Sequence, residues 1–149
     1  MEWVVKTFNE LDAEELYKIL QLRVDVFVVE QRCAYPELDG YDFRSIHYYL
    51  KDGEEIAAYA RLLPAGSMYE EASIGRVLVA AKYRGNGYGR QLLANVLHYM
   101  KNEQVYTLKI QAQQYLKKFY ESFQFRQISE PYLDDGIWHI DMTWVNDHN

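Results

Sequence analysis

The order of apolar and polar residues predicts that the chain opens with a strand, a helix and a long loop. Residues 3–8 are rich in strand-forming side chains. Asp12 offers an N-cap for a helix. Helical spacing then joins the apolar residues Leu16, Ile19, Leu20, Val24 and Phe27. Over residues 28–44 the periodicity breaks up around Pro36 and Gly40, which is typical of a loop.

A β-hairpin and a further strand are predicted next. Residues 46–51 and 55–62 have the composition of strands and flank Asp-Gly at 52–53, a dipeptide that supplies the positive φ angles of a tight turn. Residues 73–79 form another run of strand-forming side chains, with Gly75 as a candidate bulge.

In the second half of the chain, the sequence pattern predicts a glycine-containing loop, a helix, a strand, a second helix and a final strand. The loop covers residues 84–89 and the first strand covers 105–110. The first helix places on one face Leu92, Leu93, Val96, Leu97 and Met100. The last helix is expected to direct toward the core Tyr115, Leu116, Phe119 and Phe123. The final strand, 137–144, alternates and is expected to pair with a strand near 127–129.

Length and composition favour one α/β (α+β) domain over residues 1–149. The length suits a single compact domain, and no linker interrupts the chain. Apolar residues make up 49% and charged residues 26%, the balance of a globular protein with a real core. The longest uninterrupted apolar runs, 56–60 and 77–81, are far shorter than the roughly 18 residues that cross a bilayer. No membrane partner is expected.

The net charge and the cysteine content limit the location and the partners that we expect for this protein. The first residues include an acid and no long apolar stretch, unlike a signal peptide. Cys33 is the only cysteine, which excludes an internal disulfide and fits a reducing cytoplasm. The net charge of -6 has the wrong sign for a nucleic-acid partner. No His-Glu-x-x-His motif or other clustered ligand spacing occurs, so no metal is predicted.

The loop over residues 84–89 predicts an anion site. Gly85, Gly87 and Gly89 stand at alternate positions, and residues without Cβ allow backbone N–H groups to turn inward together. The N-terminus of the following helix adds partial positive charge, and Arg84 and Arg90 add full charges. A pyrophosphate would suit this loop.

Two common phosphate ligands do not fit the spacing. The dinucleotide fingerprint needs a third glycine where this chain has Arg90, and an acid near Ile110, where there is none. The P-loop needs Lys and Ser or Thr after its last glycine, whereas Gly89 is followed by Arg90 and Gln91. NAD and a P-loop nucleotide are therefore disfavoured.

The remaining pattern, Arg84-x-x-Gly87-x-Gly89 after a hydrophobic strand, resembles the acetyl-CoA signature of the GNAT N-acetyltransferases. The order of strands and helices over the whole chain is similar to that of this family, and residues 119–125 match its late Tyr-x-x-x-Gly-Phe motif around Tyr120. A narrower resemblance to the ElaA-type branch rests on Val26-Phe27-Val28-Val29-Glu30-Gln31, Asp39-Gly40-x-Asp42, His47 and Ala60-Arg61-Leu62-Leu63-Pro64.

This resemblance implies a central mixed, mostly antiparallel sheet flanked by helices, with a splayed strand pair that holds acetyl-CoA. Backbone groups of Val77 and Val79 would pair with the pantetheine arm, and the loop would wrap the pyrophosphate. The implied cofactor-binding residues are Val77, Leu78, Val79, Arg84, Gly85, Asn86, Gly87, Tyr88, Gly89, Arg90 and Gln113. Gln113 stands where the family often has Asn.

The resemblance also assigns chemistry. Tyr120 corresponds to the general acid, and a phenol with a pKa of about 10 stays protonated at neutral pH while it can protonate a thiolate. A tyrosine that only packs in the helix is the alternative. The backbone N–H near Val79 would stabilise the oxyanion. Gln124 replaces the family glycine, so a left-handed helix cap there would cost about 1 kcal/mol or more, and the helix can end differently.

The general base stays open at this point. Glu30, Glu37, Asp39 and His47 lie in or beside the loop where the family builds its acceptor site, and any of them or a water chain could deprotonate the amine. A ping-pong alternative would use Cys33 as the nucleophile, with His47 or His139 as its base.

These residues predict an acetyl-CoA-dependent N-acyltransferase that acts on an amine acceptor. Glu30, Glu37, Asp39 and Asp42 concentrate negative charge beside the expected acceptor site, which favours a cationic amine. A non-catalytic module that senses CoA or binds a protein is the alternative function. The sequence leaves the oligomeric state open, a homodimer included.

Overall fold

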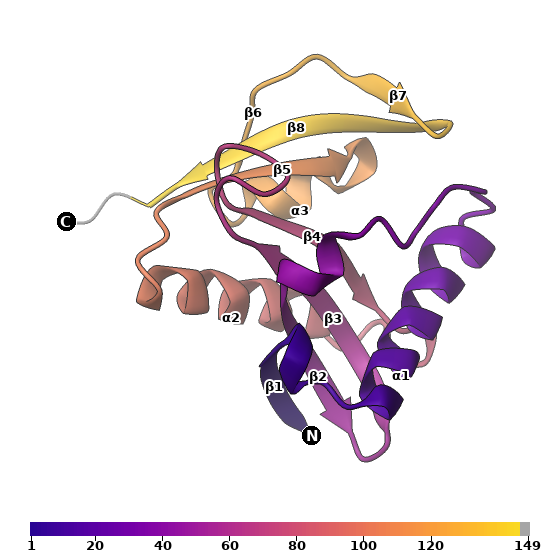
Figure 1. The fold of residues 1–149 in the computed structure, drawn as a ribbon. Coiled ribbons are helices and arrows are strands. Elements are labelled where there is room, and N and C mark those ends of the chain that lie inside the picture. The colour runs from indigo at the N-terminus through magenta and orange to yellow at the C-terminus, as the bar shows by residue number, and fades with distance from the viewer. Residues whose placement is uncertain (147–149) are drawn as a thin grey trace.

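Two antiparallel sheets and three helices make up residues 1–146, which are the residues that the structure, a computed structural model, describes (Figure 1). The strands are β1 (Glu2–Thr7), β2 (Ile46–Asp52), β3 (Glu55–Leu63), β4 (Ser73–Val79), β5 (Thr107–Gln113), β6 (Arg126–Gln127), β7 (Tyr132–Asp134) and β8 (Ile137–Val145). The helices are α1 (Ala13–Val24), α2 (Tyr88–Asn102) and α3 (Lys117–Glu121), and the short helical turns are η1 (Phe8–Glu10), η2 (Asp25–Glu30), η3 (Tyr41–Arg44), η4 (Ala81–Tyr83) and η5 (Gln114–Leu116). Within the described residues, no helix has the length and apolar character that a membrane span requires.

The N-terminal half forms a four-stranded sheet in the order β1-β2-β3-β4. Successive side chains of β3 point to opposite faces. Tyr59 packs in a cluster with Ile19 of α1, whereas Ala58 packs in the larger cluster that contains Leu92 of α2. The two helices therefore cover opposite faces of this sheet (Figure 1). Gly53, at φ 60°, makes the predicted hairpin turn between β2 and β3.

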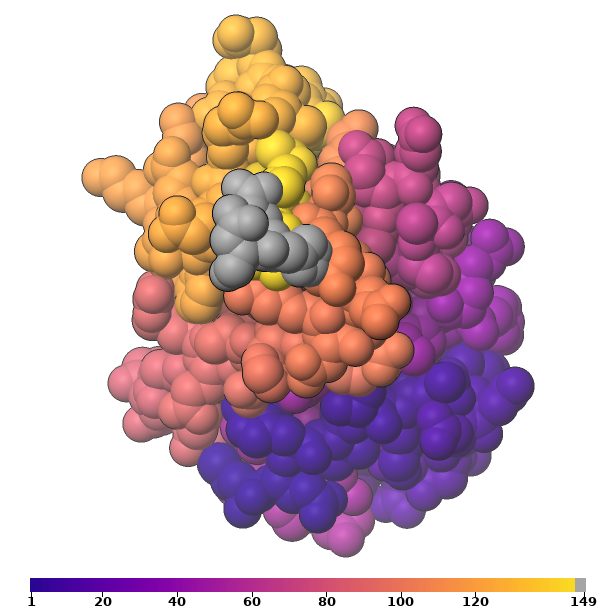
Figure 2. Space-filling model, turned by 90° about the vertical axis from the view of Figure 1, so that its left-hand side faces the viewer, coloured from indigo at the N-terminus to yellow at the C-terminus, as the bar shows by residue number. Residues whose placement is uncertain are grey.

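The C-terminal half forms a second sheet in which β8 pairs with β5, β6 and β7. The pairing of the last strand with residues near 127 is confirmed, whereas β7 is a strand that the sequence pattern did not predict. Figure 2 shows the C-terminal strands and the N-terminal segment at opposite ends of one face of the molecule.

The two sheets join only at the start of β4 and β5. Ala72 bridges Leu108 in parallel orientation, and the Lys109 N–H donates to the Ala72 carbonyl at 3.0 Å. Beyond this bridge, the outer edge of β4 pairs with no strand in residues 1–146, and the two strands diverge (Figure 1). The expected mostly antiparallel fold with a splayed strand pair is confirmed.

The last helix differs from its prediction. Tyr115 was expected in the core, but its side chain is 74% exposed, and Tyr120 is buried instead at 7%. The cause is the helical turn η5, whose tighter winding precedes α3 and breaks the 3.6-residue spacing on which the prediction depended.

The chain leaves α3 through a left-handed residue that is not glycine. Gln124 has φ 74°, its N–H donates to the Glu121 carbonyl at 3.0 Å, and the Phe125 N–H donates to the Tyr120 carbonyl at 3.2 Å. This is the helix end that a glycine would favour. The helix therefore ends in the left-handed conformation with Gln124 in place of a glycine.

A buried carboxylate anchors the long loop to the rest of the fold. Glu37 is 3% exposed and lies between two arginines. Arg23 of α1 donates from Nε to Glu37 Oε2 at 2.8 Å, and Arg76 of β4 donates from Nε to the same oxygen at 2.7 Å. Because a buried charge is costly unless it is paired, these contacts define where the loop can lie.

The network continues to two aspartates of the same loop. Arg23 donates to Asp42 Oδ1 at 2.6 Å, and Arg61 of β3 donates to both oxygens of Asp39 at 2.8 and 2.9 Å. Arg76 also donates to Asp39, at 3.3 Å. Side chains from α1, β3, β4 and the loop therefore share one set of ion pairs.

This network holds a bulge in β4. Gly75 pairs regularly with Arg61, whereas Arg76 and Val77 together lie opposite Ala60. The expected bulge is therefore present, but at Arg76 and not at Gly75. Arg76 has φ 52°, a conformation that costs a non-glycine residue about 1–2 kcal/mol. The ion pairs of its guanidinium offset this strain.

We predict that Gln124→Gly stabilises the protein by about 0.5–1 kcal/mol, because glycine adopts a positive φ without the Cβ clash. Urea unfolding followed by circular dichroism measures the change. Lys118→Gly, in α3, is the matched control and should destabilise by a similar amount. Destabilisation by both substitutions would show that Gln124 is not strained.

We predict that Glu37→Gln destabilises the protein by about 3–5 kcal/mol, because it leaves the buried guanidinium of Arg23 and the half-buried one of Arg76 beside a neutral amide. The same unfolding measurement tests it. Glu70→Gln changes an exposed carboxylate and should cost less than about 0.5 kcal/mol. Equal effects of the two substitutions would contradict the anchoring role of Glu37.

Candidate active site

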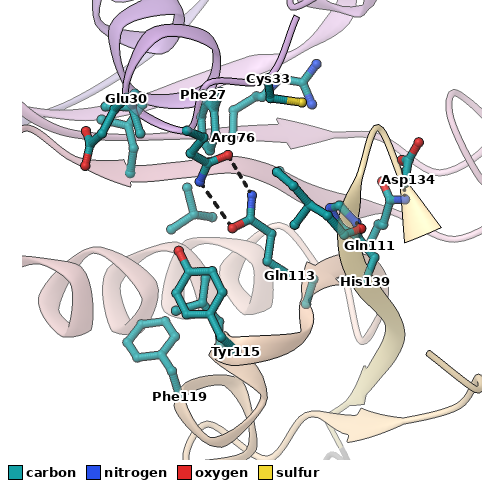
Figure 3. A pocket seen from close by; sticks show the side chains of 18 of the residues that line it. Phe27, Glu30, Cys33, Arg76, Gln111, Gln113, Tyr115, Phe119, Asp134 and His139 are labelled. Carbon is teal, nitrogen blue, oxygen red and sulfur yellow. Dashed lines mark hydrogen bonds between the residues drawn. The ribbon is translucent and has the colours of Figure 1, made fainter. Parts of the chain in front are cut away.

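A cleft of about 490 Å³ opens where β4 and β5 diverge (Figure 3). One wall comes from β4 and from residues 26–35, which follow α1. The opposite wall comes from β5, from residues 115–120 and from the β7–β8 hairpin. A cleft of this size with both apolar and polar walls can hold the arm of a cofactor and a small acceptor.

The cleft brings together about half of the cofactor-binding residues that the sequence predicts. Those that line it are Val77, Leu78, Val79, Arg84, Gly89 and Gln113. The others lie in the adjoining loop and the first turn of α2; they are Gly85, Asn86, Gly87, Tyr88 and Arg90.

The loop before α2 has the conformation that its glycines predict. Gly85 has φ 82°, and Gly87, the N-cap of α2, has φ 79°. The Asn86 side-chain amide donates to the carbonyls of Tyr83 at 3.1 Å and Arg84 at 3.3 Å, so it holds the loop in shape. The first N–H groups of α2 have no partner within the helix and are available to an anion.

Arg84 lies at the cleft, but its guanidinium already holds a carboxylate. Its two terminal nitrogens donate to the two oxygens of Glu30, and Nε donates to the Val79 carbonyl at 3.0 Å. The Arg84 hydrogen bonds lower the pKa of Glu30. Glu30 is therefore held as a carboxylate of weakened basicity, in spite of its place in the cleft.

Arg90 is directed toward α3. Its guanidinium lies over the ring of Phe123 at 4.7 Å and that of Phe119 at 5.9 Å, and it donates to Ser122 Oγ at 3.1 Å. These contacts hold a positive charge beside the loop without a carboxylate partner among the described residues.

Tyr120 presents an unpaired hydroxyl to the cleft. Its ring packs edge-on against Phe119 at 5.3 Å and Phe125 at 5.5 Å. The hydroxyl makes no hydrogen bond to any residue in 1–146, although the side chain is 7% exposed and lines the cleft. Burial raises the pKa of Tyr120 well above its ordinary value. The phenol stays protonated and has its proton free for a ligand.

A pair of amides spans the middle of the cleft. Gln31 donates to Gln113 Oε1 at 3.2 Å, and Gln113 donates to Gln31 Oε1 at 3.1 Å. In Figure 3, Glu30 and Phe119 lie on one side of Gln113, and Asp134 and His139 on the other. The site role of Gln31 was not predicted, because only the fold brings it to Gln113.

The far side of the cleft holds Cys33 as an unreactive thiol. Its Sγ donates to the Asp135 carbonyl at 3.2 Å, and burial, together with the nearby acids, raises the pKa of the thiol. A thiolate nucleophile needs the opposite shift. The ping-pong alternative through Cys33 is therefore disfavoured.

Three of the four candidates for the base do not line the cleft; one of them, Glu37, is the buried carboxylate between Arg23 and Arg76. His47 is fully buried, accepts from the Tyr59 hydroxyl at 2.7 Å and donates to the Asp42 carbonyl at 3.0 Å. Burial lowers the pKa of His47. Asp39 is held by Arg61, as described above. None of these three side chains lines the cleft.

The acidic residues of the loop do not form an unpaired negative patch. Glu30 pairs with Arg84, and the other three acids belong to the arginine network. The argument for a cationic acceptor from these acids was therefore wrong, because partners distant in sequence neutralise them. Within residues 1–146, no group of three or more His, Cys, Asp or Glu side chains is arranged to hold a metal ion.

Comparison with known proteins agrees with this architecture. The family model for the acetyltransferase (GNAT) domain matches residues 13–146. A UPF0039 protein of Schizosaccharomyces pombe is 43% identical over 145 residues, which cover 95% of each chain. Protein ElaA of Escherichia coli strain K12 is 39% identical over 149 residues, which cover 96% of this chain and 95% of ElaA.

Solved structures extend the similarity to three dimensions. The crystal structure of an acyl-CoA N-acyltransferase from Pseudomonas aeruginosa superposes with a TM-score of 0.92 at 35% identity, and covers 97% of this chain and 99% of that one. Escherichia coli ElaA superposes with a TM-score of 0.89 at 38% identity and the same coverage. Fold, cleft and sequence together establish that this chain is a member of the GNAT acetyltransferase family and of its ElaA-like branch.

Proposed function

We propose that this protein transfers an acetyl group from acetyl-CoA to a primary amine of a small molecule or peptide. The transfer is direct, within a ternary complex of protein, acetyl-CoA and acceptor. The observation that supports it most is the unpaired hydroxyl of Tyr120, a residue that is 7% exposed and lines the cleft between β4 and β5. Family membership supports acyl transfer from an acyl-CoA in general, and the acetyl group and the amine are the proposed details.

Acetyl-CoA would enter from the side of the loop over residues 84–90. The pyrophosphate would accept hydrogen bonds from the N–H groups around Gly85 and Gly87 and from the start of α2. The pantetheine arm would lie along the free edge of β4, where Val77, Leu78 and Val79 line the cleft. Its thioester would then reach Tyr120.

The chemistry needs a neutral amine, a stabilised oxyanion and a proton for the leaving thiolate. The amine nitrogen attacks the thioester carbonyl carbon, and a backbone N–H near Val79 would donate to the oxyanion. As the C–S bond breaks, Tyr120 gives its proton to the CoA sulfur. The proton that then leaves the acetylated nitrogen restores the phenol, so Tyr120 ends the reaction unchanged.

The alternative is a module that binds CoA without catalysis. Both proposals need the loop and the free edge of β4, and only catalysis needs an acid at Tyr120. Release of free thiol from acetyl-CoA with a panel of primary amines separates them. Turnover with at least one amine supports the enzyme, whereas CoA binding without turnover supports the module. A cytoplasmic location and a homodimer stay predictions from the sequence.

We predict that Gly87→Asp weakens acetyl-CoA binding by about tenfold or more, because the new carboxylate would face the pyrophosphate. Titration calorimetry measures the Kd. Gly66→Asp is the matched control, since Gly66 has φ 81° and no atom near its added Cβ, as at Gly87, but lies away from the cleft. Equal affinities of the two variants would contradict the proposed pyrophosphate site.

We predict that Tyr120→Phe lowers kcat by about 10² to 10⁴ and leaves acetyl-CoA affinity unchanged, because it deletes one proton and keeps the ring. Steady-state kinetics and calorimetry together measure the pair of values. Tyr99→Phe, on α2 and outside the cleft, should leave both values unchanged. A loss of only a few-fold in Tyr120→Phe would mean that water protonates the thiolate.

A further inference from the structure

The end of the cleft beyond the Gln31–Gln113 pair contains a histidine to which the proposed function assigns no task. His139 of β8 faces Gln113 of β5 and Tyr132 of β7 in the strand register. Directly opposed residues of antiparallel strands project to the same face, with Cβ atoms about 5 Å apart. His139 lines the cleft and lies on the side of Gln113 away from Glu30 (Figure 3).

The hydrogen bond of its ring fixes the tautomer of His139. Nδ1 lies 2.8 Å from the Ile137 carbonyl oxygen, which can only accept. Nδ1 therefore carries a proton, and in the neutral ring Nε2 keeps its lone pair. The ring also stacks on Tyr132, with centroids 6.3 Å apart and planes at 26°. Both contacts hold the ring in one orientation.

The groups around His139 include neutral amides, a phenol and carboxylates. Gln113 and Gln111 on β5 are neutral amides, and the phenol of Tyr132 donates to Asp141 of β8. Asp134 accepts from Gln111 Nε2 at 2.7 Å and has no cationic partner within residues 1–146.

On the opposite wall, the titratable or charged side chains that line the cleft are Glu30, Cys33, Tyr35, Arg76 and Arg84. Of these, Glu30 pairs with Arg84, and Tyr35 donates to Glu37. Cys33 is a neutral thiol that donates to the carbonyl of Asp135, and Arg76 is held by Glu37. The Asp134 carboxylate is thus left to attract an ammonium group to this end of the cleft.

The other candidate bases are occupied or distant. Glu30 is paired with Arg84, and both ring nitrogens of His47 are engaged in the core. His98 lies exposed on α2, outside the cleft. Among the histidines of residues 1–146, His139 alone combines a place in the cleft with a ring nitrogen that makes no hydrogen bond.

We propose that the acceptor binds at this end as an alkylammonium ion and that Nε2 of His139 removes its proton. The proposal rests on the proposed function and names its general base and acceptor class. The N–H bond of the ammonium breaks, the proton moves to Nε2, and the neutral amine attacks the thioester. The imidazolium then releases this proton to solvent. The second nitrogen proton, released as the C–S bond breaks, restores Tyr120.

The kinetic experiment compares kcat/KM against pH for the wild type, His139→Asn and His139→Gln. The acceptor is the fastest of spermidine, a lysine-containing peptide and 2-phenylethylamine. If the protein supplies a base, the wild type binds the ammonium ion, and its kcat/KM levels off at a pH below the pKa of the amine. The variants lack this base and can use only the unprotonated form of the acceptor. Their kcat/KM therefore keeps rising tenfold per pH unit up to the pKa of the amine. We expect a loss of about 10² or more at pH 7 that shrinks as pH rises.

His139→Asn keeps a donor toward the Ile137 carbonyl, and His98→Asn is the matched control for loss of a histidine. Acetyl-CoA affinity should be unchanged in all variants. Rescue of His139→Ala by added imidazole would support the proposal further. Variants of His139 with the wild-type pH profile and at least half its kcat/KM would overturn it.

A second measurement does not depend on turnover. Nitrogen NMR of ¹⁵N-histidine-labelled protein reads the tautomer of His139 and its response to spermidine in the presence of CoA. The Nδ1–H tautomer with an Nε2 signal that moves on addition of spermidine supports the proposal. The opposite tautomer, or an Nε2 signal that does not move, overturns it. Absence of turnover by the wild type, in contrast, counts against the proposed function. The NMR result can still be read in that case, because it does not require turnover.

Discussion

The fold of the active site depends on one buried carboxylate. Glu37, 3% exposed, joins Arg23 of α1 to Arg76 of β4 and so ties the loop after α1 to the strand that forms one wall of the cleft. Arg76 occupies the bulge of β4 beyond the bridge to β5, at a positive φ that needs compensation. The ion pairs of the Arg76 guanidinium provide this compensation. The same loop brings Gln31 and Cys33 to the cleft.

Binding of an anionic cofactor to this protein would depend on short-range contacts and not on the net charge. A chain of net charge -6 repels a polyanion such as CoA at long range, so affinity for it has to come from directed donors at short range. The glycine turn before α2 offers such donors, and Arg90, held over Phe123, adds a cation there. Arg84 is shared with Glu30, whose carboxylate lies where a phosphate would compete for the same guanidinium.

In the proposed reaction, Tyr120 donates a proton and His139 accepts one, and the surroundings of each side chain suit its proposed role. Tyr120 lies among aromatic rings, where burial keeps its phenol protonated. His139 lies on a sheet, where a backbone carbonyl holds the proton on Nδ1. Gln113 of the amide pair lies between Phe119, whose ring packs against Tyr120, and His139 (Figure 3), and so divides the proposed cofactor side from the proposed acceptor side. In the proposed reaction, the acid and the base would therefore act from different parts of one cleft without neutralising each other.

Local patterns in the sequence determined the strands other than β7, the helices α1 and α2 and the glycine turn, because their period, caps and φ requirements involve residues near one another. Asp12 caps α1 as predicted, accepting from the Glu15 N–H at 2.7 Å. The tertiary structure alone decided which charges are paired: Glu37 meets arginines 14 and 39 residues away, so acids that look free in the sequence are neutralised. It also decided that His139 and Gln31 flank Gln113, since strand register and loop docking bring together residues whose separation in the sequence carries no periodic signal.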